Sequence, residues 1–94
     1  MTTVTLEGLL VCRDADDAAL VAELLPTHIA LTRAEAGCLS FVVVATDDPL
    51  VWSVSERFSD PASFRSHQAR VASSEWGAAT ASIERRYVVT GLDD

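Results

Sequence analysis

One histidine and one glutamate in this sequence have the placement that acid–base chemistry needs. His67 lies in a predicted helix, on the same face as two apolar residues, so its ring is expected to point inward. Glu56 lies in a predicted strand, on the same side as Trp52 and Phe58. If that side of the strand faces the helix, the carboxylate and the imidazole share one cavity. The histidine could then act as a general base, with Glu56 orienting it.

Four aromatic residues are candidates for the wall of such a cavity: Trp52, Phe58, Trp76 and Tyr87. A structural interpretation stands beside the chemical one. An inward histidine can be a hydrogen-bonded core residue, and Phe58 and Trp76 can be ordinary core residues. Glu56 can lie near a sheet edge in water or pair with an arginine, and His28 is expected to be structural.

The elements that position these residues follow from hydrophobic periodicity. The predicted strands span residues 4–12, 38–45, 51–58 and 86–92. A first helix ends at about Ala36, before Gly37, and Pro26 inside it predicts a kink or a short break. Asp60 and Pro61 begin the second helix, as cap and first residue. A further helical segment begins at residues 73–74.

The order strand, helix, strand, strand, helix, strand predicts an α+β fold, the ferredoxin-like βαββαβ arrangement. Its antiparallel sheet has the spatial order 4-1-3-2, with helices on one face. The first two strands are apolar on both sides, yet two helical regions can cover only one face of the sheet. The other face would leave a large apolar patch in water. We therefore expect the sheet to pack against a second copy in a two-fold homodimer.

Length and charge narrow the class of protein. The 94 residues, 1–94, fit one domain, and the formal net charge is −7. All the basic side chains are arginine, which excludes a Schiff-base lysine, and no basic cluster exceeds Arg85-Arg86, which disfavours nucleic acid. No apolar run could cross a membrane, and no signal peptide is evident, so we expect a cytoplasmic protein. Cys12 and Cys38 are expected at opposite ends of the sheet, too far apart for a disulfide.

Motifs for several kinds of site are missing from the sequence. It contains no G-x-S-x-G, no H-E-x-x-H and no glycine-rich phosphate loop. No spacing of cysteine and histidine resembles a zinc site, so we predict no metal. The chemistry must come from ordinary side chains or from the reactivity of the substrate itself.

Four short motifs resemble the antibiotic biosynthesis monooxygenase family of dimeric α/β-barrel proteins, and the resemblance covers nearly the whole chain. They are Arg33-Ala34-Glu35-Ala36-Gly37-Cys38-Leu39, then Glu56-Arg57-Phe58 with Asp60, then His67, and finally Ser73-Ser74-Glu75-Trp76. Two positions depart from the usual pattern. The family usually has proline where Ala36 stands and often has tryptophan in place of Phe58.

The resemblance implies the ferredoxin-like fold and the homodimer. It also implies a monooxygenase that oxidises a small aromatic, quinol or anthrone-like polyketide substrate with O2, using no metal, flavin or other cofactor. In that case His67 is the base or an orienting donor, and Glu56 is its partner or a second acid/base. Trp52, Phe58 and Trp76 wall the pocket, and Tyr87 or an arginine holds a substrate oxygen. Relatives that cleave haem use an asparagine, and this chain has none, which disfavours haem degradation.

Two alternatives from other functional classes stay open. The same pocket could serve an isomerase or a cyclase that transfers protons without oxygen. A dimer without catalytic activity could bind a small apolar ligand or act as an accessory subunit. The sequence leaves the substrate and the pathway undetermined.

Overall fold

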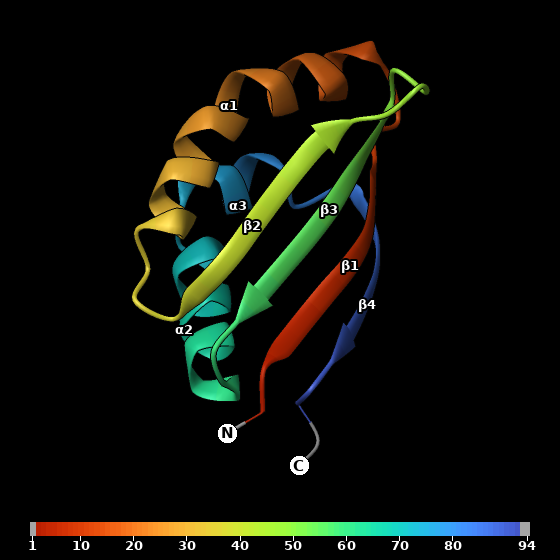
Figure 1. Ribbon diagram of the computed structural model, residues 1–94. Coiled ribbons are helices and arrows are strands. Elements are labelled where there is room, and N and C mark those ends of the chain that lie inside the picture. Colours follow the sequence, from red (N-terminus) through yellow and green to blue (C-terminus); the bar gives the residue numbers. More distant parts are fainter. Residues whose placement is uncertain (1, 93–94) are drawn as a thin grey trace.

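The computed structural model describes residues 2–92, so Met1, Asp93 and Asp94 of the predicted domain lie outside the described residues. Seven elements follow one another along the chain (Figure 1). They are β1 (Val4–Val11), α1 (Ala15–Arg33), β2 (Cys38–Ala45), β3 (Val51–Phe58), α2 (Pro61–Ala72), α3 (Glu75–Ala79) and β4 (Glu84–Thr90). The predicted ranges of β2 and β3 are confirmed. The last strand begins and ends two residues earlier than predicted.

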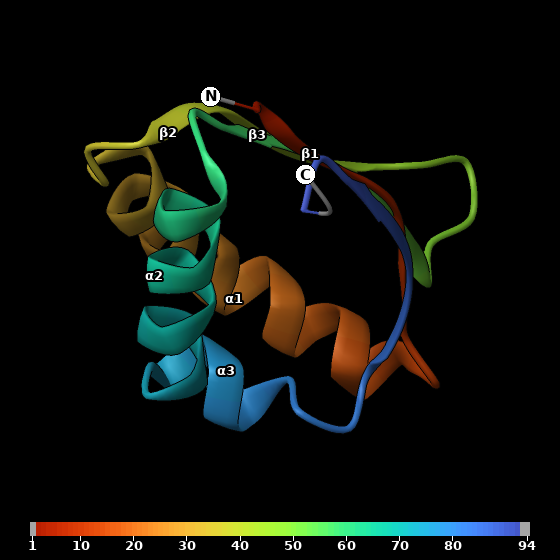
Figure 2. The same cartoon turned by 90° about the horizontal axis from the view of Figure 1, so that it is seen from below.

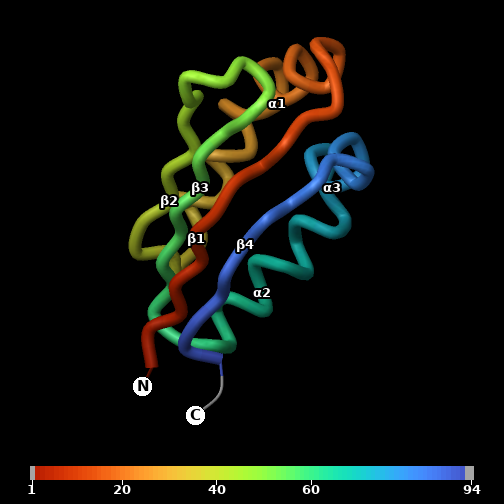
Figure 3. The backbone as a smooth tube through the Cα atoms, turned by 90° about the vertical axis from the view of Figure 1, so that its right-hand side faces the viewer, coloured from red at the N-terminus to blue at the C-terminus, as the bar shows by residue number. Residues whose placement is uncertain are grey.

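The four strands form one antiparallel sheet in the order β2-β3-β1-β4, which is the predicted topology. All three helices lie on one face of this sheet, and the sheet is open rather than closed into a barrel (Figure 2). β1 and β4 run side by side, so β1 begins and β4 ends at the same end of the sheet (Figure 3). The fold is therefore the ferredoxin-like α+β arrangement.

Side-chain caps begin the helices as the sequence predicts. The Asp14 carboxylate accepts a hydrogen bond from the backbone N–H of Asp17 at 2.9 Å, and Asp60 accepts one from the N–H of Ser63 at 2.7 Å. The helix α1 continues through Pro26, so of the kink or short break predicted there the break is absent. Its end differs from the prediction, since it lies at Arg33 rather than near Ala36. The residues between Arg33 and β2 therefore form a turn, which becomes important at the site.

The core lies between the helices and the inner face of the sheet. Val4, Leu6 and Leu10 of β1 are buried there. Neighbouring positions of β2 and β3 are buried with them: Phe41, Val43, Val54, Glu56 and Phe58. Because strand side chains alternate, this register also turns Glu56 and Tyr87 toward the helices. The core thus contains a carboxyl group that the strand pattern forces inward.

The outer face of the sheet carries several exposed apolar side chains. Leu9, Val42, Val44 and Val88 all lie on this face, and between 37% and 68% of each is exposed. Leu39 is exposed as well, because the pairing of β2 with β3 shifts by one residue between Cys38 and Ser40. No helix covers this face in the part of the chain that the structure describes.

Two sequence-based expectations about the chain can be checked directly. Cys12 is buried, Cys38 is half-buried, and both are free thiols, as predicted. Within residues 2–92, no helix is long and apolar enough to cross a membrane.

Candidate active site

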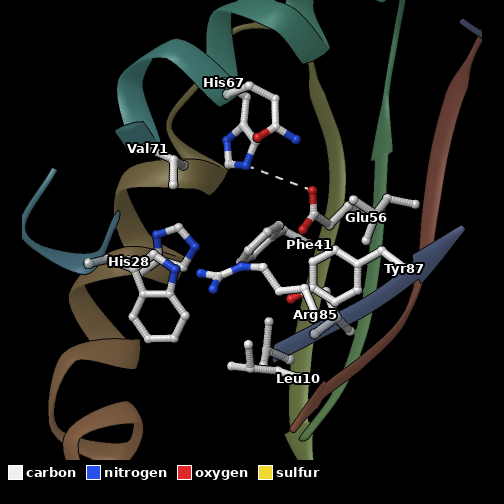
Figure 4. Close-up of a pocket in the computed structure, with 13 residues that line it drawn as sticks. Leu10, His28, Phe41, Glu56, His67, Val71, Arg85 and Tyr87 are labelled. Atoms are coloured by element: carbon white, nitrogen blue, oxygen red, sulfur yellow. Dashed lines mark ion pairs between the residues drawn. The ribbon is translucent and has the colours of Figure 1, made fainter. Parts of the chain in front are cut away.

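His67 lies at the centre of the candidate site, because the inward stripe of α2 buries it against the sheet. Its two ring nitrogens face two different glutamates. Nδ1 lies 2.9 Å from Glu35 Oε1. Nε2 lies 3.7 Å from Glu56 Oε1, and a dashed line joins this pair in Figure 4. The first distance is a hydrogen bond, and the second is too long for one. A buried imidazole between two carboxyl groups is an arrangement suited to proton transfer.

Glu56 is buried on β3, where its strand partners are Leu6 on one side and Phe41 on the other. Its Oε1 atom has no hydrogen-bond partner among the described residues. Burial away from water, aided by the negative charge of Glu35, raises the pKa of Glu56 to about 7, although Arg85 opposes the rise. Near neutral pH this carboxyl group can therefore either donate or accept a proton.

A cavity of about 50 Å³ opens in front of these two groups. Its lining includes apolar side chains of β1, β2, β3 and α2, together with polar side chains of α1, α2, β3 and β4. Four lining residues that are exposed or half-buried come from α2 and β4, and they mark the mouth of the cavity: Gln68, Val71, Arg85 and Tyr87. A cavity of this size has room for a few water molecules. A larger ligand requires these side chains to move.

Aromatic rings form the helix side of the cavity. The indole of Trp76 stacks on the His28 imidazole, with centroids 4.4 Å apart and planes 6° apart, and Phe41 meets His28 edge-on. His28 Nδ1 is buried and has no hydrogen-bond partner in the described part of the chain. Burial, followed by the positive charges of neighbouring groups, lowers the pKa of His28 to about 4, so the ring stays neutral at physiological pH. Predicted only as structural, His28 lines the cavity beside His67.

Two polar side chains of β4 complete the lining. Arg85 reaches toward α3, where its guanidinium donates to the carbonyl O of Thr80 at 2.7 Å and to the Oγ1 atom of Thr80 at 2.8 Å. Tyr87 is half-buried, and burial raises its pKa to about 12, so its phenol keeps its proton. Tyr87 can therefore donate a hydrogen bond to a ligand oxygen.

A second hollow lies on the other side of His67, between the turn after α1 and helix α2. It is a surface groove of about 480 Å³, and Glu35, His67 and Arg70 lie in its lining. Arg70 donates from Nε to Glu35 Oε2 and from Nη2 to Thr32 Oγ1, the latter at 2.9 Å. The sequence-based prediction missed Glu35 as a site residue. Its one sequence signal was its place in the motif that precedes Gly37.

Comparison with known proteins identifies the family. A model of the family described as antibiotic biosynthesis monooxygenase matches residues 13–79. The chain belongs to the antibiotic biosynthesis monooxygenase family. No curated protein matches the chain.

Solved structures agree with this family at the level of the fold. Rv0793 from Mycobacterium tuberculosis is 21% identical with a TM-score of 0.77, over 99% of this chain and 97% of that chain. A candidate antibiotic biosynthesis monooxygenase from Nitrosomonas europaea is 18% identical with a TM-score of 0.77, over 95% and 96%. MupZ from Pseudomonas fluorescens is 19% identical with a TM-score of 0.79, over 97% of this chain and 70% of that chain.

Within this family member, the predicted wall residues divide into two groups. Trp76 and Tyr87 line the cavity together with Glu56 and His67. Trp52 and Phe58 do not line it, although they share the inward side of β3. Phe58 lies behind His67, with ring centroids 4.9 Å apart, and Trp52 pairs with Leu10 toward the opposite end of the strand. Alternation along a strand predicts the face of a side chain but not its distance from the site.

Among residues 2–92, no cluster of three or more histidine, cysteine, aspartate or glutamate side chains could hold a metal ion. Glu35 and Glu56 each face a different ring nitrogen of His67.

Proposed function

We propose that this protein is a monooxygenase that oxidises a small aromatic, quinol or polyketide-like substrate with O2 and without a cofactor. The observation that carries the proposal is the His67 imidazole, which is buried beside an aromatic cavity. Among residues 2–92, its Nε2 atom makes no hydrogen bond. A base in a water-poor cavity can remove a weakly acidic proton from a substrate. Membership of the monooxygenase family supports the choice of oxygen as the second substrate.

The proposed reaction begins from a substrate with an activated CH2 group beside a phenolic ring. His67 Nε2 takes one proton, and the electron pair stays on the substrate as a carbanion. The carbanion gives one electron to O2, and the resulting radical and superoxide combine to form a C–O bond. The imidazolium returns its proton to the peroxide. Loss of the second C–H proton then breaks the O–O bond and leaves a carbonyl group and one water molecule.

The neighbouring residues supply the other requirements of this sequence. Tyr87 and Arg85, at the mouth, are positioned to hold the substrate oxygen on which negative charge develops. Glu56, with its pKa of about 7, can return a proton to an oxygen intermediate at neutral pH. Trp76 and Phe41 offer flat apolar surfaces to an aromatic ring.

Oxygen consumption tests this function. We expect uptake above the autoxidation background with at least one compound from a panel of hydroquinones and anthrones, and its loss in His67→Ala. Arg65→Ala is the matched control, since Arg65 is exposed on the same helix. Uptake that is equal in wild type and His67→Ala would contradict the role of the base. Proton exchange of the substrate without uptake would instead favour the isomerase or cyclase alternative.

We also propose that a second copy of the chain covers the outer face of the sheet. The support is the apolar group Leu9, Val42, Val44 and Val88, which a lone chain would leave in water. Because the same patch on both copies would meet across a two-fold axis, the contact closes as a homodimer. Sedimentation at micromolar concentration should give twice the mass of one chain. A single-chain mass would refute this part of the proposal.

A further inference from the structure

His67 separates two spaces of different character. Its Nε2 atom faces the enclosed cavity and Glu56, while its Nδ1 atom faces the open groove and Glu35. The side chain of Glu35 is 20% exposed, whereas that of His67 is 4% exposed. The Nε2 side of the ring therefore faces an enclosed cavity. The Nδ1 side is bonded to Glu35, which lies at the protein surface.

We propose that Glu35 is the positioning residue for His67, which keeps the proton on Nδ1 and leaves the Nε2 lone pair directed at the cavity. This inference rests on the proposed function only for its catalytic consequence. The placement of the proton itself concerns the resting protein and needs no substrate.

The hydrogen bonds around Glu35 explain why the arrangement has one stable form. An ionised carboxylate only accepts hydrogen bonds, so a ring nitrogen that bonds to it must be the donor. Arg70 donates to the other carboxylate oxygen and also to Thr32 Oγ1, which in turn donates to the carbonyl O of His28. Both oxygens of Glu35 are therefore engaged, and its orientation is fixed from α1 and α2 together.

The charges around His67 favour the same assignment. Glu35 faces the ring from the turn after α1, Glu56 from β3 and His28 from α1, and Arg70 lies one turn further along α2. Burial lowers the pKa of His67 below its usual value, while the hydrogen bond and the charge of Glu35 act in the opposite direction. When Nε2 takes a proton from the substrate, the new imidazolium lies beside the Glu35 carboxylate. Glu35 does not itself have to accept a proton.

The variant Glu35→Gln provides a sharp test, because Arg70 has only hydrogen-bond donors. The amide oxygen of the variant must face Arg70, so its NH2 group must face His67 Nδ1. The ring nitrogen there becomes an acceptor, and the proton moves to Nε2. The variant therefore keeps the size of the side chain but inverts the tautomer of His67.

Nitrogen-15 spectra of the histidine rings measure the tautomer directly, with His67 identified by its loss in His67→Ala. When the His67 ring of the wild type is neutral, we expect a proton on Nδ1 and none on Nε2. In Glu35→Gln we expect the proton on Nε2 and none on Nδ1. Glu23→Gln, at an exposed position of α1, should match the wild type. In Glu35→Gln with Arg70→Met, the amide is free to turn its oxygen to Nδ1, and the wild-type tautomer should return. Circular dichroism checks that each variant is folded.

Each result has a definite meaning. A wild-type spectrum with the proton on Nε2 overturns the proposal without any variant. An unchanged tautomer in folded Glu35→Gln overturns it as well. If the tautomers are as expected but no probe consumes oxygen, the monooxygenase function fails while the role of Glu35 stands. If oxygen is consumed, Glu35→Gln should lower kcat by roughly 10²- to 10⁴-fold. KM should change little, because Glu35 does not line the enclosed cavity.

Discussion

Replacing Glu56 by glutamine removes a titrating group from the core and keeps its shape. The carboxyl pKa rises from an ordinary value of 4.5 to about 7 in the folded chain, because burial disfavours the charged form. The protonated form is therefore the one that the fold tolerates. Its contribution to stability is complete below pH 4.5 and is lost as the pH rises through 7. Above that pH, the wild type contains a buried charge that Glu56→Gln lacks.

The pKa difference sets the size of the effect. Each pKa unit corresponds to about 1.4 kcal/mol, so the wild type loses roughly 3 kcal/mol of unfolding free energy by pH 8. At pH 5 the corresponding loss is under about 1 kcal/mol. The advantage of Glu56→Gln over wild type should therefore grow by roughly 2–3 kcal/mol between pH 5 and pH 8. For a domain of this size, that is a rise in Tm of about 10–20 °C relative to wild type.

The comparison with the variant is necessary because the two buried histidines act in the opposite direction. The pKa values of His28 and His67 are lowered by burial, so these rings destabilise the fold as the pH falls below 6.5. Their effect partly hides that of Glu56 in wild type, but it cancels between the two proteins. Burying the new amide of Glu56→Gln has a free-energy cost that does not depend on pH. This cost therefore cancels when the stability difference at pH 5 is subtracted from that at pH 8.

Urea unfolding followed by tryptophan fluorescence at pH 5 and pH 8 gives the required free energies. The protein concentration is held fixed, since association would shift the midpoint. Glu23→Gln, on the exposed face of α1, should match wild type at both pH values. If the advantage of Glu56→Gln is the same at pH 5 and pH 8, Glu56 is ionised throughout this range and the reasoning is wrong.

Three further substitutions test the sheet surface, a helix cap and the strand packing around the site. Val44→Glu introduces a charge on the outer face of the sheet and should convert the proposed dimer to monomers, which sedimentation would measure. An intact dimer would exclude this face as the interface. Asp60→Ala removes the hydrogen bond to the Ser63 N–H and should cost about 1 kcal/mol in urea unfolding, with an unchanged midpoint as the contrary result. Gly8→Ala would place a Cβ atom 2.0 Å from the carbonyl O of Arg86, so it should destabilise the chain by roughly 1–3 kcal/mol. A variant as stable as wild type would show that β4 can move away.

The sequence alone was sufficient for most of the fold, because periodicity and capping are local properties. Three features follow from neighbouring residues in the sequence: the range of β2, the beginning of α2 at Asp60-Pro61 and the inward direction of His67. The strand order followed from the sequence of elements. Of the kink or short break predicted at Pro26, the break does not form, because α1 is continuous through this residue.

The site was predicted less completely, because it depends on contacts between distant parts of the chain. Glu35 meets His67 only once the turn after α1 is packed against α2, and no periodicity connects those two segments. Trp52 and Phe58 were expected at the cavity because they share a strand face with Glu56. Neither residue lines the cavity, because its position along β3 depends on how the helices pack against the sheet.

The placement of His67 between a groove and a cavity separates two properties that enzyme engineers usually have to change together. In the proposed function, selection of the substrate by its shape depends on side chains that line the cavity, such as Val43, Val54 and Leu6. In the same proposal, the strength of the base depends on the turn residue Glu35 and on its partner Arg70. A library that varies the apolar lining can therefore search for new substrates with the base unaltered, and substitutions around the groove can adjust its reactivity at a constant cavity shape.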